Sequence, residues 1–328
     1  MFLIAFLALA MVLVAMLLLQ QQGLGGKYGR STSDREVRWT GTWDVPDIDT
    51  CTDSEVAYGR VLVTNTSHFY GPNGSISTTA NGMDCQSCHQ VAGTDFLGNN
   101  YSAVASMYPQ VRARTGKTET IEYRISDCFQ RSLNATPPAV ESREMKALVA
   151  YMKWLGYAVP KGSIPKGAGI IEISYMTKPA DPARGKKVYR RYCSACHGEQ
   201  GQGIPQLVSD APQQKLQSVY LYPPLWGPHS YTKGAGMYRI SRLAGFIKTN
   251  MPNGVTFEDP ALTDEQAWDV AAFINSQPRP DFDVRNDWPD ISKKPIDYPF
   301  GPYADSFPES QHKFGPYGPI ASFYRLNR

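Results

Sequence analysis

Four of the six cysteines fall in two copies of one short motif. In each copy two residues separate the cysteines and a histidine follows the second cysteine directly: Cys85, Cys88 and His89, then Cys193, Cys196 and His197. Two thiols one helical turn apart can form thioether bonds to the vinyl groups of one porphyrin, and the adjacent imidazole can reach its iron. The sequence therefore predicts two covalently bound c-type haems, each ligated by a histidine.

Two other uses of paired cysteines fit this pattern less well. A zinc site built from both pairs does not require the histidines, and 104 residues separate Cys88 from Cys193. A thioredoxin-like redox pair needs a βαβ pattern, which surrounds neither motif. Haem attachment is the best interpretation of both motifs.

The sixth ligand of each iron separates an electron carrier from a catalyst. For the second haem, the downstream candidates are Met237, Met251 and His229. For the first haem, they are Met107, Cys128, Met145 and Met152. Two of these methionines fit the buried positions of a helix and the third lies in a loop, which leaves the cysteine as the remaining candidate.

A basic segment surrounds Cys128. Residues 112–132 hold five basic and three acidic side chains, and a helix over residues 119–133 would place Arg124, Cys128 and Arg131 on one face. A thiol among guanidinium groups is favoured as the thiolate, the form needed for iron ligation and for nucleophilic sulfur chemistry. Arginine also suits sulfur oxyanions. A structural disulfide between Cys128 and Cys51 is equally compatible with the spacing.

Helix signals mark out the domains that must position these residues. The periodic segment 142–155 ends at Gly156 and closes a first domain. A Pro/Gly-rich linker follows, and Asp181 with Pro182 begins the next helix. The last helix of the second domain opens with a capping box from Thr263 to Gln266. Each domain thus has its motif near the start and a helix at the end, as small helical cytochrome c domains do.

The chain ends are different in character. Residues 1–19 are apolar and would span roughly 28 Å as a helix, which predicts a membrane segment. Because no A-x-A cleavage pattern follows, an uncleaved anchor is favoured over a removed signal peptide. Basic residues at 27–38 would place the body in the cytoplasm, but covalent haem attachment occurs outside it, so we expect the opposite side. Residues 23–80 read as a lead-in with short strands at most, such as 60–64. Residues 278–328 read as an extended, non-helical strap along the domains, with a mobile tail as the alternative.

The expected fold is therefore mainly α. Two cytochrome c-like helical domains lie in tandem, each with one haem, between the membrane segment and the strap: 1–22 anchor, 23–159 first domain with its lead-in, 160–180 linker, 181–277 second domain and 278–328 strap. A hydrophobic fraction of 42% excludes a disordered chain. The net charge of +3, spread along the chain, excludes a nucleic-acid partner.

Several segments together resemble the dihaem c-type thiosulfate dehydrogenases. They are CQSCHQVAG (85–93), YPQVRARTGKTETIEYRISDCFQRSLN (108–134), YCSACHGEQGQG (192–203), YPPLWGPHSYTKGAGMYRI (222–240), FIKTNMPNG (246–254) and YPFGPYADSFPESQHKFGP (298–316). The resemblance covers most of the chain beyond the anchor. Two differences stand out: the family commonly has RSMNG where this chain has RSLNA at 131–135, and Cys51 has no counterpart role.

The resemblance implies roles for particular residues. The family's cysteine in the RIxxCxxRS segment is an axial thiolate of the first haem at the thiosulfate site; it corresponds to Cys128, with Arg124, Arg131 and Ser132 beside it. The GAGM methionine ligates the second haem, which selects Met237. Some members have a competing lysine just before this methionine, where this chain has Gly236.

The leading hypothesis is an enzyme that oxidises two thiosulfates to tetrathionate, reversibly in principle. Electrons would pass from the haem of His89 and Cys128 to that of His197 and Met237, and then to a redox partner such as a soluble cytochrome or a membrane oxidase. The expected location is the periplasmic side of the bacterial cytoplasmic membrane. The alternatives are a membrane-tethered dihaem electron carrier without its own substrate, and another sulfur-oxyanion oxidoreductase.

Overall fold

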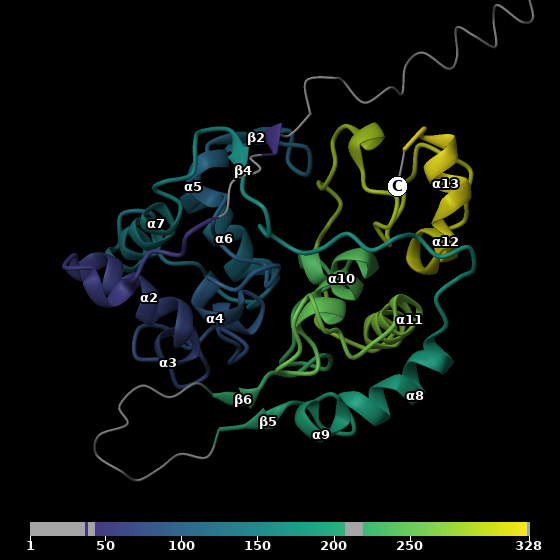
Figure 1. Cartoon of the computed structure of the whole chain (residues 1–328), viewed down its shortest axis with the longest axis horizontal. Coiled ribbons are helices and arrows are strands. Elements are labelled where there is room, and N and C mark those ends of the chain that lie inside the picture. The colour runs from purple at the N-terminus through teal and green to yellow at the C-terminus, as the bar shows by residue number, and fades with distance from the viewer. Residues whose placement is uncertain (1–36, 39–42, 207–218, 327–328) are drawn as a thin grey trace, which may run out of the picture. The chain divides into compact units, whose positions relative to one another are not determined.

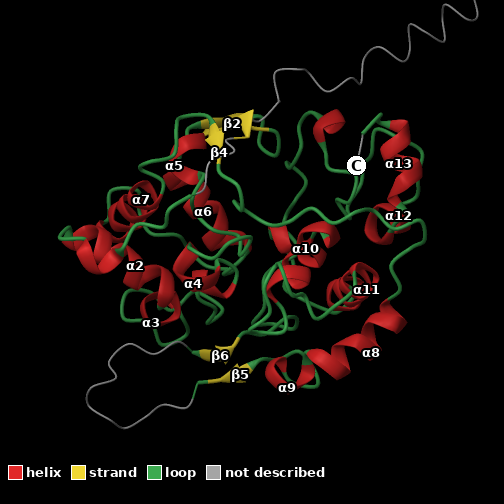
Figure 2. Ribbon diagram, viewed as in Figure 1, coloured by secondary structure: helices red, strands yellow, loops and turns green. Residues whose placement is uncertain are grey.

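Pairs of crossing helices form the two halves of the fold (Figures 1 and 2). The computed structural model describes residues 37–38, 43–206 and 219–326, and the described residues up to Gly318 form one compact unit. In the first half α2 (Ser54–Thr64) packs against α7 (Arg143–Leu155). In the second half α8 (Pro182–Tyr192) packs against α11 (Asp264–Asn275), with α10 (Ile240–Asn250) next to α11. The predicted helical character of both halves is confirmed.

A glycine lets the helices of each pair approach closely. A Cβ atom on Gly59 of α2 would lie 2.1 Å from the carbonyl oxygen of Ala147 on α7. A Cβ atom on Gly185 of α8 would lie 1.9 Å from the carbonyl oxygen of Asp269 on α11. Because close-packed interiors leave no room for such a contact, both crossings require glycine at this point.

The capping residues predicted from the sequence begin and end these helices. Ser142 accepts a hydrogen bond from Met145 N at 3.2 Å, and Gly156 is the C-cap of α7. Asp181 caps α8 ahead of Pro182, and the capping box of Thr263 begins α11. These side chains satisfy backbone N–H groups that the first helical turn leaves without partners, which fixes where each helix starts.

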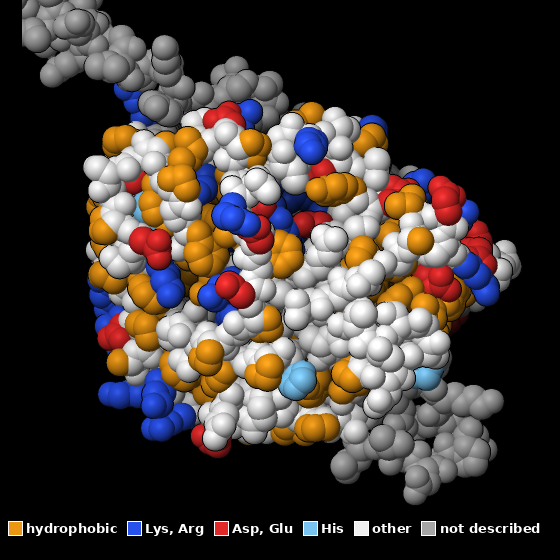
Figure 3. All heavy atoms as spheres, turned by 180° about the vertical axis from the view of Figure 1, so that it is seen from behind, with side chains coloured by type: hydrophobic (Ala, Val, Ile, Leu, Met, Phe, Trp, Pro, Cys, Tyr) orange, Lys and Arg blue, Asp and Glu red, His pale blue; other side chains and the backbone are white. Residues whose placement is uncertain are grey.

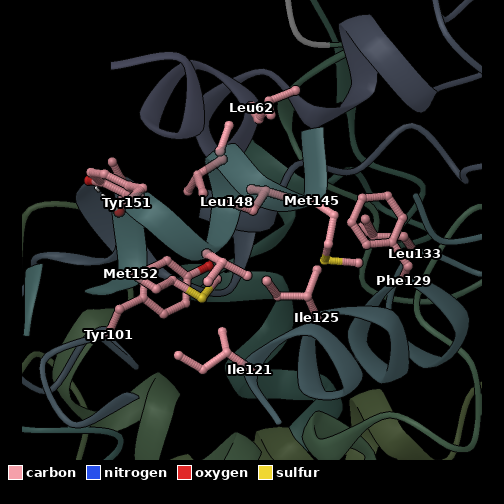
Figure 4. Packing of buried hydrophobic residues seen from close by; sticks show 14 of the residues in the cluster. Leu62, Tyr101, Ile121, Ile125, Phe129, Leu133, Met145, Leu148, Tyr151 and Met152 are labelled. Carbon is pink, nitrogen blue, oxygen red and sulfur yellow. Dashed lines mark hydrogen bonds between the residues drawn. The ribbon is translucent and has the colours of Figure 1, made fainter. Parts of the chain in front are cut away.

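The first hydrophobic core lies between α7 and α6 (Ile121–Arg131). Figure 4 shows Ile125 and Phe129 of α6 beside Met145 of α7. The two motif cysteines Cys85 and Cys88 pack against this core as half-buried residues. The core therefore holds the first motif and helix α6 next to each other.

The structure corrects the interpretation of residues 23–80 as a lead-in with short strands. Residues 60–64 belong to α2, which begins after the N-cap Asp53 and buries Val56, Leu62 and Val63. Packing against α7 outweighs the strand preference of the β-branched residues in this segment. The helix around Cys128 is also shorter than the predicted 119–133, because Thr120 caps it and Ser132 ends it.

Shorter elements connect these helices. Before α6 lie η2 (Ile48–Thr50), α3 (Thr66–Tyr70), η3 (Cys85–Ser87), α4 (Gln90–Gly93) and α5 (Val104–Met107). Later elements include α9 (Ser194–His197), η4 (Gly236–Tyr238) and η5 (Ile291–Lys293). Three small sheets complete the described part: parallel β1 (Val37–Arg38) with β4 (Ser163–Ile164), antiparallel β2 (Gln110–Arg112) with β3 (Lys117–Glu119), and antiparallel β5 (Ile204–Pro205) with β6 (Tyr220–Tyr222).

The terminal segments differ from expectation in one respect. The strap contains helices α12 (Glu309–Phe314) and α13 (Tyr317–Phe323), so the prediction that it lacks helices is wrong. Pro308 stands at the N-cap of α12, where its missing N–H costs nothing. The predicted membrane helix at residues 1–22 lies outside the described residues. Within the described ranges, every helix is too short or too polar to cross a bilayer.

Candidate functional site

Each haem motif forms a tight turn that brings its two thiols together. In the first motif, Cys85 begins η3, and its backbone N–H donates to Thr66 Oγ1 at 3.0 Å. The backbone N–H groups of Cys88 and His89 both donate to the carbonyl of Cys85. In the second motif, α9 follows α8 directly. There the backbone N–H groups of Cys196 and His197 donate to the carbonyl of Cys193. Cys51 and Cys128 do not form a disulfide with each other.

Both motif histidines are oriented for iron ligation. Nδ1 of His89 lies 2.5 Å from the carbonyl oxygen of Asn99, and Nδ1 of His197 lies 2.8 Å from that of Pro223. A carbonyl oxygen only accepts, so each Nδ1 carries the proton and each Nε2 keeps its lone pair. Burial lowers the pKa of His89 to about 4 and also lowers the pKa of His197, so both rings are neutral. The thiols and the imidazole of each motif fit a c-type haem.

Three residues are candidates for the sixth ligand of the second haem. Met237 and Met251 lie at one apolar cluster, and His229 does not. Met237 is 9% exposed on η4, within a cluster that includes Tyr231, Tyr238 and Phe246. Met251 packs against this cluster, whereas the side chain of His229 is exposed. If the second haem takes a thioether ligand, its donor comes from this cluster.

Cys128 lies beside the first motif. It is half-buried on α6. Burial raises the pKa of the Cys88 thiol to about 12, and the negative charge that Cys128 can carry adds to this increase. The same charge is the main cause that raises the pKa of Arg124, and Arg124 in turn helps to lower the pKa of His89. The predicted grouping of Cys128, Arg124 and the first motif is thus present.

Three arginines surround one carboxylate next to this cysteine. Arg124 Nη1 lies 3.1 Å and Arg114 Nη1 3.7 Å from Asp127 Oδ2, and Arg131 Nε donates to Asp127 Oδ1. Although burial opposes it, the three guanidinium groups lower the pKa of Asp127. Arg131 also pairs with Asp287 and Arg124 lies near the buried Glu119, so the cluster holds balancing charges, and Arg124 is its most exposed cation beside Cys128.

Arg131 is held by other protein groups. Its two Nη atoms donate to both carboxylate oxygens of Asp287 at 2.8 and 2.7 Å, and Nη1 also lies 3.3 Å from the carbonyl of Gly234. Its own carbonyl accepts from Thr232 N and Oγ1. Arg131 thus joins α6 to the strap and to the segment that leads to Met237.

Ser132 also contributes backbone contacts at this junction. Its carbonyl accepts from Asn81 Nδ2 at 3.0 Å, and the same amide nitrogen donates to the carbonyl of Ser230 at 3.1 Å. The side chain of Ser132 is half-buried at the end of α6. Ser132 thus lies in the same connection between α6 and residues 230–234 as Arg131.

Two residues of this cluster were missed in the sequence. Arg114 is 8% exposed and its Nε has no hydrogen-bond partner among the described residues. Its place in the basic segment was a usable signal, because two arginines stand there two residues apart. Asp287 offered no signal, since it lies 156 positions from Arg131 in a loop of the strap.

Two family descriptions match the chain, one for each motif. "SoxA/TsdA, cytochrome c domain" matches residues 76–158, and "Cytochrome c" matches residues 182–278. These ranges contain the first and second motifs respectively. The protein accordingly carries two c-type haems.

Similar proteins share one name. Thiosulfate dehydrogenase of Allochromatium vinosum is 41% identical over 62% of this chain and 72% of its own, and that of Psychrobacter arcticus is 34% identical over 76% and 72%. Among solved structures, thiosulfate dehydrogenase (TsdBA) of Marichromatium purpuratum matches with a TM-score of 0.62 and 31% identity over 74% of this chain; the chain spans half of that longer chain. The protein with Cys128 beside its first haem motif belongs to the thiosulfate dehydrogenase family.

Proposed function

We propose that this protein oxidises two thiosulfate ions to tetrathionate at Cys128 and passes two electrons to its haems. The observation that carries the proposal is the position of Cys128, next to Arg124 and to the thiols of the first motif. A guanidinium group beside the sulfur can bind the sulfonate oxygens of thiosulfate. The family relationship supports thiosulfate as the substrate.

The chemistry on the cysteine balances in two steps. In the first, the Cys128 thiolate forms an S–S bond to the terminal sulfur of one thiosulfate and two electrons are released, which leaves a thiosulfonate on Cys128. In the second, the terminal sulfur of another thiosulfate attacks the outer sulfur of this disulfide, tetrathionate departs and the thiolate is restored. The bound haems supply the electron-accepting capacity for the first step.

The arginines offset the repulsion between the anions. Two dianions at 4 Å repel by about 1 kcal/mol per pair of unit charges in water, and by more where water is excluded. Arg124 is one-third exposed and adjoins Cys128, so we assign it the contact with substrate. Arg131 is committed to two carboxylates, so its proposed role is to fix α6, with Ser132 beside it.

The ligands follow from the same arrangement. We assign His89 and Cys128 to the first iron, and His197 and Met237 to the second. Met237 is preferred over Met251 because it lies within the buried cluster, whereas Met251 packs on its outside. The domain boundaries at 159, 180 and 277 remain predictions, as does the placement of the body on the periplasmic side with residues 1–22 as its anchor.

Electrons would leave through the second haem to a separate redox protein. Four exposed cations, Lys186, Lys187, Arg190 and Arg191, stand on one face of α8 just before the second motif. None of them forms an ion pair with a residue in the described part of the chain, whereas Arg184 on the same helix pairs with Asp269. Figure 3, seen from behind, shows Lys and Arg side chains gathered at its lower left edge. This face fits an acidic surface on the electron acceptor.

Substitution of Cys128 tests the proposal. In Cys128→Gly both motifs are intact, so both haems should attach, while reduction of the haems by thiosulfate should slow by on the order of 100-fold or more. Stopped-flow absorbance of the haems measures this rate. Cys51→Ala is the matched control and should react normally. Normal thiosulfate-dependent reduction in Cys128→Gly would show that thiosulfate is not oxidised at Cys128 and would overturn the proposal.

A further inference from the structure

Arg279 is a buried cation without a counter-charge in the described part of the chain. It follows α11 and is 9% exposed. Its Nη2 donates to the carbonyl of Ile274 at 2.7 Å, but neither Nε nor Nη1 has a hydrogen-bond partner among the described residues. Burial of an unpaired charge is strongly unfavourable, and unsatisfied buried N–H groups add to the cost. An acceptor outside the described residues is therefore expected.

Two tyrosines occupy the faces near the guanidinium group. Its central carbon lies 4.2 Å from the ring centre of Tyr231 and 5.0 Å from that of Tyr238. Ring faces stabilise a cation but do not replace the in-plane acceptors that N–H groups need. The unused hydrogens on Nε and Nη1 thus remain available to a charged oxygen.

These tyrosines connect Arg279 to the first haem motif and to Met237, the proposed ligand of the second iron. Tyr231 and Met237 belong to one apolar cluster, and Cys88 of the first motif packs against it. The amide of Asn275 donates to the carbonyls of Met237 and Tyr238 at 3.3 and 3.0 Å. Arg279 therefore lies beside a cluster that contacts Cys88 of the first motif and contains Met237.

We propose that Arg279 binds a haem propionate through one of its unsatisfied nitrogens, Nε or Nη1, which lie on different edges of the guanidinium group. A c-type haem brings two carboxylates with it, and a guanidinium group is the side chain best suited to pair with a carboxylate in a buried site. Both haems carry propionates, so the chemistry is the same for either. The inference rests on the two haems and is independent of any reaction at Cys128.

Variants of Arg279 test this pairing by redox potential. Arg279→Gln should lower the midpoint potential of one haem, because an uncompensated propionate favours the ferric state, and should leave the other unchanged. Arg279→Lys, which keeps the charge, should shift it less. Spectroelectrochemical titration follows each haem by its own absorbance. The haem whose midpoint potential shifts is the one whose propionate binds Arg279. Mass spectrometry should find both haems attached.

An exposed arginine nearby provides the control. The side chain of Arg285 is 86% exposed and pairs with Asp283, so Arg285→Gln should leave both potentials unchanged. The proposal is overturned if both potentials in Arg279→Gln equal those of the wild type. Unchanged potentials with a raised KM would assign Arg279 to substrate binding instead. If Arg279→Gln fails to mature, Arg279→His decides: the potential of one haem should fall below that of the wild type as the pH rises and the imidazole loses its charge, and wild-type potentials at every pH would reject the pairing.

Discussion

Arg131 and Asp287 form a two-pronged ion pair that joins the helix of Cys128 to the C-terminal strap. Both Nη atoms lie within 2.8 Å of the carboxylate, and the two side chains are 9% and 6% exposed. The hydroxyl of Tyr298 donates to the same carboxylate at 3.0 Å. The strap thus contributes a buried carboxylate that holds the helix of Cys128 and does not merely lie along the domains.

Removal of the strap carboxylate should destabilise the protein. In Asp287→Asn the buried guanidinium loses a charged partner, so the free energy of unfolding should fall by about 3 kcal/mol. Denaturant unfolding monitored by circular dichroism measures the change. Asp283→Asn removes a neighbouring carboxylate from an exposed pair and should cost far less stability. Equal losses in the two variants would contradict a buried role for Asp287.

Arg124 should govern substrate binding more than stability. Arg124→Gln removes the cation next to Cys128, so kcat/KM for thiosulfate should fall on the order of 10- to 100-fold while the unfolding midpoint changes little. Steady-state kinetics with an artificial electron acceptor provide the measurement. Lys153→Gln, on the exposed side of α7, is the control and should behave as wild type. An unaffected kcat/KM in Arg124→Gln would remove this arginine from the site.

The exposed basic face of α8 should control electron delivery. Reversal of charge at Lys186, Lys187, Arg190 and Arg191 should slow electron transfer to an acidic acceptor about tenfold or more at low salt, and should weaken the salt dependence of that rate. Reduction by thiosulfate within the protein should not change. The matched control reverses Lys146 and Lys153 on α7. Unchanged transfer, or loss of binding to anionic lipid vesicles alone, would assign the face to another partner.

Replacement of the glycines at the two helix crossings should destabilise the helix pairs. Gly59→Ala would place a methyl group against the carbonyl of Ala147, and Gly185→Ala against that of Asp269. Each should cost about 1 to 3 kcal/mol of unfolding free energy, because backbone must move to make room. Thermal unfolding measures this cost. At Gly318 no atom lies within 4 Å of the added carbon, so Gly318→Ala should be neutral or slightly stabilising. A comparable loss there would show that crowding is not the cause.

Local patterns predicted the parts of the fold that depend on neighbouring residues. Ser142, Asp181 and Thr263 mark helix starts because their side chains bond amides two or three residues away. The prediction of a strand at residues 60–64 was wrong because a contact with a distant helix decides the structure of this segment. Its β-branched side chains favour a strand locally, but contact with α7, made possible by Gly59, stabilises a helix.

The sequence by itself determined the two haem motifs, the capping residues and the basic segment around Cys128, since each is a pattern of residue types at short spacing. Only the tertiary structure decided which arginines are available: Arg131 is paired with Asp287, 156 positions away, whereas Arg279 is buried with Nε and Nη1 lacking partners in the described chain. Charge pairing depends on distances of a few ångströms across the folded chain, and residue spacing along the chain does not specify such distances.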